Sequence, residues 1–209
     1  YAEDGINTQY IVRDCKAPSG IAMIMVDEKG ENAISVASGA NMHLTPADVD
    51  CAAPVITTAD VVLLQLEVPY ETVQHTAAKA GRAGVPVILD PAPARKLGTE
   101  LLQHVDYLTP NEVEAELLTG IKVIDDTTAD QAAHRLLDAG VGTVIITLGP
   151  RGAWWATEND CGLIPAEKVT AVDTTAAGDA FNGGLAVAIA EQWTLEKAIR
   201  FAGCTGALS

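Results

Sequence analysis

The chain has 209 residues, 48% of them hydrophobic but only 4% aromatic, which suits one compact domain with a core of aliphatic side chains. Its formal net charge of −15 argues against nucleic acid and anionic membrane surfaces as partners, because so acidic a chain repels polyphosphate backbones over long range. No apolar run in the sequence reaches the ~18 residues that a membrane-spanning helix needs.

The first predicted element is a β-hairpin within residues 17–37. Two short segments rich in apolar and β-branched residues, "GIAMIMVD" and "NAISVAS", flank the sequence "EKGE". Gly30 in that sequence can adopt the positive φ of a tight turn. We therefore expect two paired strands in this part of the chain.

From Val61 onward, buried strands are predicted to alternate with helices. The apolar strand segments cover residues 61–67, 85–90, 105–110 and 142–149. The helical segments cover residues 71–83, 111–118 and 128–139, and a glycine follows each of them. This alternation is typical of βαβ units and predicts an α/β fold, in which a parallel sheet lies between two layers of helices.

Residues with polar or turn-forming character follow each predicted strand: Glu67, Asp90-Pro91, Thr109 to Asn111, Thr147 to Gly152, and the segment from Asp173. In open α/β sheets, ligands bind beyond the carboxyl ends of the strands. These five places are therefore the candidate site segments.

The most informative segment is "VDTTAAGDAFNGGLAVAIAE", residues 172–191. Ala176, Ala177 and Gly178 carry almost no side chain, so the unpaired N–H groups at the start of the following helix can approach a ligand closely. Together with the helix dipole, these groups predict a pocket for a phosphoryl group. Asp179 beside that pocket suits a general base that takes a proton from an attacking hydroxyl, whereas the structural alternative is a helix cap.

This segment also carries a family resemblance. "DTTAAGDAFNGG" resembles the C-terminal signature of the ribokinase family of carbohydrate kinases, also called the phosphofructokinase-B family. Further segments resemble the same family in the expected order over essentially the whole chain: "SGIAMIMVDEKGENAISVASGAN", "LLQLEVP", "DPAPAR", "LTPNEVEAELLTG" and "ITLGPRGAWW". The resemblance implies ATP-dependent phosphorylation of a sugar hydroxyl, with ribose as the expected acceptor because "PAPAR" and the hairpin are most similar to members that act on ribose.

The resemblance also implies roles for individual residues. Asp179 is expected to be the base and to contact both sugar and ATP, beside an anion hole formed by Ala176, Ala177 and Gly178, the last of which also contacts ATP. Glu67 is expected to bind the sugar, because a carboxylate can accept from two hydroxyl groups. Its structural alternative is an exposed residue at a strand end.

The remaining roles concern the nucleotide and metal ions. Asn111 is expected to face the triphosphate, and Glu114 to bind Mg²⁺ through water. Without the resemblance, Asn111 would be interpreted as a helix N-cap and Glu114 as a solvated helix residue. Asp173 and Thr175 are expected to bind a monovalent cation, usually K⁺. The expected nucleotide-binding turn consists of Thr147, Leu148, Gly149, Pro150, Arg151 and Gly152.

By the same resemblance, residues 17–37 are part of a β lid that closes over the sugar and could form a homodimer. Residues 1–16 and 38–209 would then be the kinase core. We expect both ends of the fold to be missing, since the chain opens at Tyr1, after the position of the family's glycine-rich sugar-binding motif. Gly203 stands where relatives often carry a larger polar residue, and we do not assign it to the site.

Cysteine usage favours a cytoplasmic protein. Cys15, Cys51, Cys161 and Cys204 show no C-x-x-C spacing, so we expect reduced thiols rather than metal ligands or disulfides.

Several alternatives remain open at this stage. The acceptor could be a nucleoside, fructose or a phosphorylated sugar. A non-catalytic sugar- or nucleotide-binding relative is also possible, although the presence of Asp179 argues against it. A Rossmann dehydrogenase and a Walker A kinase are disfavoured, because neither G-x-G-x-x-G after an early strand nor G-x-x-x-x-G-K-[ST] occurs.

Overall fold

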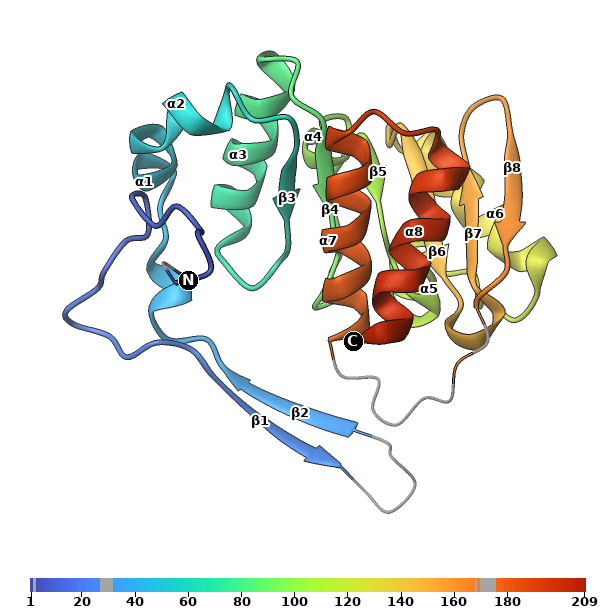
Figure 1. Ribbon diagram of the computed structural model, residues 1–209, viewed down its shortest axis with the longest axis horizontal. Helices are drawn as coiled ribbons and strands as arrows, with labels where there is room; N and C mark the ends of the chain where they lie inside the picture. Colours follow the sequence, from blue (N-terminus) through green and yellow to red (C-terminus); the bar gives the residue numbers. More distant parts are fainter. Residues whose placement is uncertain (2, 27–31, 168, 170–175) are drawn as a thin grey trace.

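The structure is a computed structural model that describes residues 1, 3–26, 32–167, 169 and 176–209. Asp173 and Thr175, the residues of the predicted cation site, lie outside the described residues. Figure 1 shows an α/β body from which a separate two-stranded hairpin projects.

A six-stranded sheet forms the centre of the body, in the order β3-β4-β5-β6-β7-β8. Its strands are β3 (Val62–Leu64), β4 (Val87–Leu89), β5 (Tyr107–Leu108), β6 (Thr143–Thr147), β7 (Ala153–Ala156) and β8 (Cys161–Ile164). β3 to β6 are parallel, which confirms the predicted parallel sheet. β7 and β8 were not predicted, and they pair antiparallel because short turns join them to the preceding strands.

The predicted helices are confirmed within a few residues: α3 (Tyr70–Arg82), α5 (Glu112–Thr119), α6 (Asp126–Asp138) and α7 (Ala177–Ala190). A final helix, α8 (Leu195–Leu208), follows α7. The short elements η1 (Gly39–His43), α1 (Pro46–Cys51), α2 (Ala53–Ile56), α4 (Thr99–Leu102) and η2 (Gly149–Arg151) were not predicted. One or two helical turns are too short to show a clear hydrophobic period.

Local sequence explains where two of these helices begin and end. Asn111 starts α5 and Asp125 starts α6, each accepting a hydrogen bond from the backbone N–H three residues later. Gly120 ends α5 in the left-handed conformation, at φ 76°, which costs glycine little.

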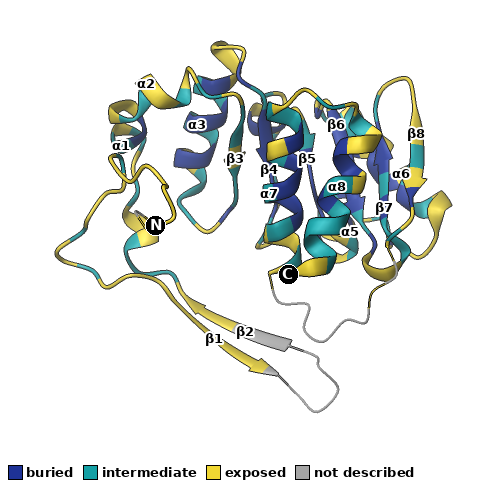
Figure 2. Ribbon diagram, in the orientation of Figure 1, coloured by how far each residue is buried: buried dark blue, intermediate teal, exposed yellow. Residues whose placement is uncertain are grey.

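Alternation along the strands divides the core between the two faces of the sheet. Ile88 and Ile145 pack on one face with α7 and α8, whereas Val144 and Ile146 pack on the other with α3 to α6. Fully buried alanines let the helices lie close to the sheet: Ala77, Ala80, Ala129, Ala132, Ala133, Ala188, Ala198 and Ala202. Figure 2 shows the resulting buried interior of the body and the contrasting exposure of the hairpin.

The carboxyl ends of the parallel strands meet at one edge. The register aligns Leu64, Leu89 and Leu108 on neighbouring strands. Beyond them, the backbone N–H of Leu66 donates to Ala92 O at 2.9 Å, joining the loops that carry Glu67 and Asp90. The predicted strand-end residues therefore lie around the same edge of the sheet.

The predicted hairpin is confirmed as β1 (Ile21–Val26) paired antiparallel with β2 (Asn32–Ala37) in a sheet of its own. It leaves Ile21, Met23 and Met25 about 60% exposed on one face. Ile24 and Val36 are exposed on the opposite face. Among the helices that the structure describes, none is long and apolar enough to cross a membrane.

Candidate functional site

A cleft of about 1040 Å³ opens at the amino-terminal end of α7. Its walls come from the η2 turn, the chain that follows β8, the first turns of α7 and the second half of α8. The lining residues are Thr147, Gly149, Pro150, Gly152, Ala153, Ile164, Pro165, Ala166, Glu167, Val169, Ala177, Gly178, Phe181, Ile199, Arg200, Gly203, Gly206, Ala207, Leu208 and Ser209. The cleft thus brings together the predicted nucleotide turn and two of the three predicted anion-hole residues.

The first turn of α7 is built to present bare backbone to this cleft. Ala177 and Gly178 line the cleft, and a Cβ added to Gly178 would meet no atom within 4 Å. The N–H groups of the first helical turn have no acceptor within the helix, so they are available to an anion. Ala176, the N-cap, is exposed and has φ 64°, a left-handed conformation that is costly for alanine and typical of functional sites.

Close packing of α8 against α7 fixes this end of the helix. A Cβ at Gly206 would lie 2.9 Å from Ala177 O, so only glycine allows α8 to pass here. Thr205 Oγ1 lies within hydrogen-bond distance of Ala180 O (2.9 Å) and of Ala202 O (2.8 Å), one on each helix. The anion site therefore rests on a tightly joined helix pair.

Asp179 is exposed at the next position along α7. Asn182 Nδ2 donates to both Asp90 Oδ2 and Gly178 O, so Asp90 lies beside the first turn of α7, and the charge of Asp179 contributes to the raised pKa of Asp90. The Asp179 side chain is therefore exposed to solvent rather than packed into the core, next to the cleft-lining Gly178. An exposed carboxylate at this position is accessible to a substrate hydroxyl.

The nucleotide turn divides its residues between cleft and core. Thr147, Gly149, Pro150 and Gly152 line the cleft. Leu148, by contrast, is 1% exposed and belongs to the hydrophobic core.

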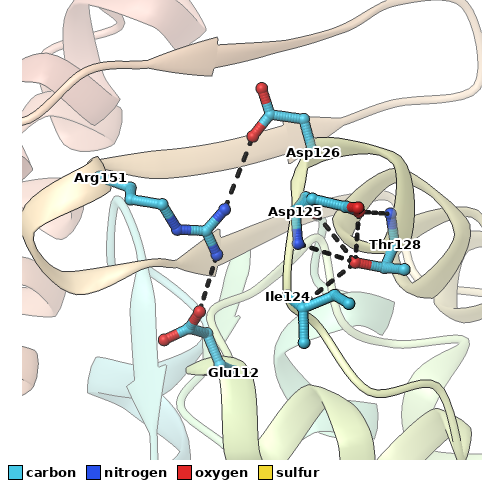
Figure 3. Close-up of polar contacts among 6 residues, drawn as sticks. All are labelled: Glu112, Ile124, Asp125, Asp126, Thr128 and Arg151. Atoms are coloured by element: carbon cyan, nitrogen blue, oxygen red, sulfur yellow. Dashed lines mark hydrogen bonds and ion pairs between the residues drawn. The ribbon is translucent and has the colours of Figure 1, made fainter.

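Arg151, from the same turn, lies outside the lining. Its guanidinium donates to Glu112 Oε1 at 2.7 Å and lies 3.7 Å from Asp126 Oδ1 (Figure 3). The side chain therefore ties the turn to the beginnings of α5 and α6.

Gly152 is the most restricted residue of the turn. Its φ of 106° is outside the range that other residues adopt, and a Cβ would collide with Ile164 O and lie 2.6 Å from Ala166 N. We expect Gly152→Ala to lower the free energy of unfolding by roughly 2–5 kcal/mol, from backbone strain plus the clash. Gly149→Ala is the matched control, because Gly149 also has positive φ but open space around it, so it should cost only ~1–2 kcal/mol. Equal losses in chemical denaturation of the two variants would contradict this account.

Asn111 and Glu114 form a reciprocal cap on α5. Asn111 Oδ1 accepts from Glu114 N at 2.9 Å, and Glu114 Oε2 accepts from Asn111 N at 2.8 Å. Glu114 is 9% exposed, so it is not the solvated helix residue that its structural alternative implied, and burial raises its pKa. Asn111 pairs with Thr147 through an isolated bridge, which places the cap beside the end of β6.

Asp90, Glu114 and Asp179 form a group of acidic residues near the strand ends. Burial, followed by the negative charge of Glu114, raises the pKa of Asp90 to about 6, and Asp179 adds to the effect. Hydrogen bonds from Ala92 N and from the Asn182 side chain oppose that rise. Among the residues that the structure describes, no three His, Cys, Asp or Glu side chains are close enough to hold a metal ion directly, so a cation near this group would have to be bound through water. Glu67 is exposed on the neighbouring loop.

Sequence reasoning missed the apolar wall of the cleft. Ile164, Val169, Phe181 and Ile199 contribute to it, but each looks like an ordinary core residue in the sequence. Gly203, which we had not assigned to the site, also lines the cleft. Arg200 adds a positive charge and lies 3.9 Å from Glu167.

Comparison with known proteins gives consistent matches. The family model described as "pfkB family carbohydrate kinase" matches residues 1–209. A ribokinase of Haemophilus influenzae is 43% identical over 209 residues, which is 100% of this chain and 68% of the relative. A ribokinase of Staphylococcus aureus is 47% identical over 178 residues, 85% of this chain and 59% of the relative. The structure of Arabidopsis thaliana ribokinase complexed with ribose and ATP has a TM-score of 0.85 and 33% identity, covering 92% of this chain and 63% of that one.

Proposed function

Because the chain belongs to the pfkB family of carbohydrate kinases, we propose that the protein transfers the γ-phosphoryl group of ATP to a hydroxyl of D-ribose, giving ribose 5-phosphate. One observation carries the proposal: the bare first turn of α7 opens onto a cleft large enough for a nucleotide, with the exposed Asp179 beside it. The two ribokinases and the ribose–ATP complex described above support ribose as the acceptor.

The proposed reaction is a direct displacement at phosphorus. The Asp179 carboxylate takes the proton of the sugar hydroxyl as its oxygen bonds to the γ-phosphorus. The bond from that phosphorus to the bridging oxygen breaks, and ADP leaves. Backbone N–H groups of Ala177 and Gly178 donate to the phosphoryl oxygens, which carry the charge in the transition state.

The cleft suits the rest of the nucleotide. Its apolar wall, which includes Ile164 and Ile199, offers a surface for the adenine base, and Arg200 adds a positive charge to the lining. In this proposal, Mg²⁺ is held through water near Glu114 and Asp90, and supplies charge neutralisation to the phosphates. The potassium role of Asp173 and Thr175 stays a prediction.

The sugar is proposed to bind on the other side of α7, near Glu67 and the strand ends. The hairpin of residues 17–37 would cover it and exclude water, whose attack on ATP competes with the sugar. The apolar side chains exposed on both hairpin faces suit pairing with a second copy, so we propose a homodimer. A cytoplasmic location agrees with four free cysteines.

An acceptor panel tests this function in the intact protein. Ribose, 2-deoxyribose, fructose and adenosine are each supplied with ATP and Mg²⁺, while ADP and the phosphorylated product are measured. We expect the highest kcat/KM for ribose. A higher kcat/KM for adenosine or fructose than for ribose would show that ribose is not the preferred acceptor. Binding of ribose and ATP without any ADP formation would support a non-catalytic binding protein.

A further inference from the structure

Asn182 is a buried amide on an otherwise apolar stretch of α7. It is 3% exposed, and its side chain makes three hydrogen bonds. Nδ2 donates to Asp90 Oδ2 at 3.0 Å and to Gly178 O at 3.1 Å, while Oδ1 accepts from Thr109 Oγ1 at 2.8 Å. One side chain thus joins the first turn of α7 to the ends of β4 and β5.

The surrounding groups allow only one orientation of this amide. A backbone carbonyl and a carboxylate both accept, so the end that faces Asp90 and Gly178 must be the NH₂ group. The Thr109 hydroxyl then donates its single proton to Oδ1, since that contact is shorter than its 3.3 Å contact with Leu89 O. Thr109 therefore supplies the donor to Oδ1 in the orientation that Asp90 and Gly178 impose on Asn182.

The carbonyl group that Asn182 binds, that of Gly178, belongs to a peptide group in the anion site. Gly178 C=O and Asp179 N–H belong to the same planar peptide group and point in opposite directions. Fixing the carbonyl toward Asn182 therefore directs the N–H of Asp179 toward the amino-terminal end of α7, alongside the N–H groups of Ala177 and Gly178. The same peptide sets the position of the Asp179 Cα and hence of its carboxylate.

We propose that Asn182 is a positioning residue. Its hydrogen bonds fix the Gly178–Asp179 peptide relative to the ends of β4 and β5, and so keep the anion site and the Asp179 carboxylate in the correct relative position. This inference rests on the proposed kinase function. Asn182 does not touch either substrate in this account; it acts through Gly178, Asp179 and Asp90. A displacement of ~1 Å at a reacting group can cost about 10²-fold in rate.

A purely structural role makes a different prediction. If Asn182 only filled space in the helix, leucine of similar size would pack well there, and stability alone would change. Leucine removes the donors to Gly178 O and to Asp90, so the half-buried Asp90 carboxylate would lose a hydrogen-bond partner. Kinetics therefore distinguish the two roles.

The test compares Asn182→Leu and Thr109→Val with wild type in the intact protein, using ribose, ATP and Mg²⁺. We expect Asn182→Leu to lower kcat by ~10- to 100-fold, while KM for ATP stays within about 3-fold because the cleft walls are unchanged. Thr109→Val should lower kcat by ~3- to 10-fold, because the amide oxygen loses its donor and the side chain is held less firmly. Thr109→Ser should restore it.

Thr76→Val is the matched control, since it also removes a buried hydroxyl, but one that donates to Thr72 O within α3. It should leave kcat near wild type after correction for the folded fraction. Normal kcat in both Asn182→Leu and Thr109→Val would overturn the inference, as would equal losses in Thr109→Val and Thr76→Val. If Asn182→Leu does not fold, the kcat values of Thr109→Val and Thr109→Ser test the inference. An inactive wild type in the same assay would instead count against the proposed function.

Discussion

Asp179→Asn should lower kcat with ribose by ~10²–10⁴-fold, the usual contribution of a general base. The amide keeps the size and shape of the carboxylate but cannot take a proton at neutral pH. Because Asp179 is exposed at the start of α7, the substitution should not disturb packing. ATP affinity, measured by titration calorimetry, should change only a few-fold, since the nucleotide cleft is lined by other residues.

Glu191→Gln provides the control for this prediction. Glu191 is an exposed acid at the opposite end of the same helix, so the substitution makes the same change in charge. Its kcat should match that of wild type. Near-normal turnover in Asp179→Asn would show that another group takes the proton.

Gly178→Val should lower phosphoryl transfer by ~10²–10³-fold, comparable to the loss of an oxyanion-hole donor. The added side chain would project into open space at the cleft rather than into the protein. It would therefore occupy the volume needed by the phosphoryl group and block the N–H groups beneath it. Glycine and valine differ little in helix propensity, so stability should change by less than ~1 kcal/mol.

Gly183→Val is the matched control for the pocket. Gly183 lies on the same helix, and a Cβ there also meets no atom within 4 Å, but the residue does not line the cleft. This variant should keep its kcat, and thermal unfolding of both variants should stay close to wild type. If Gly178→Val transferred phosphoryl groups at the normal rate, the donors would have to lie elsewhere in the molecule.

The pattern of apolar runs, helix caps and glycines along the sequence was enough to predict much of the fold. The runs around Ile88 and Ile145 are apolar because both faces of the parallel sheet are covered, and the helices between them carry clear caps and glycine stops. β7 and β8 escaped prediction because they do not alternate with helices, the pattern by which the other strands of the sheet were predicted. Their antiparallel pairing with β6 and with each other depends on the assembled sheet, which the order of apolar segments does not show.

The parts of the candidate site that come from one short segment of sequence could be predicted. The parts that depend on contacts between distant segments could not. The loop before α7 shows its small residues directly in the sequence, so the anion site and Asp179 could be proposed from it. Arg151, in contrast, was expected at the nucleotide but turns to Glu112 and Asp126. The choice of partner depends on how α5, α6 and the η2 turn come together in three dimensions.

The same reason hides Asn182. Asn182 belongs to the motif of residues 173–184. Its role, however, depends on Asp90 and Thr109, which lie 92 and 73 residues away along the sequence. The apolar wall of the cleft is hidden similarly, because Ile164 and Ile199 resemble core residues until the helices are placed.

A crystal structure of the intact protein with ribose, ADP, Mg²⁺ and aluminium fluoride tests the central claim most directly. The fluoride complex mimics the phosphoryl group in transfer. Its fluorine atoms should lie ~2.7–3.1 Å from the N–H groups of Ala177 and Gly178, with an Asp179 oxygen ~2.6–3.2 Å from the ribose hydroxyl. Aluminium fluoride bound away from α7, or ribose bound out of reach of Asp179, would contradict the account.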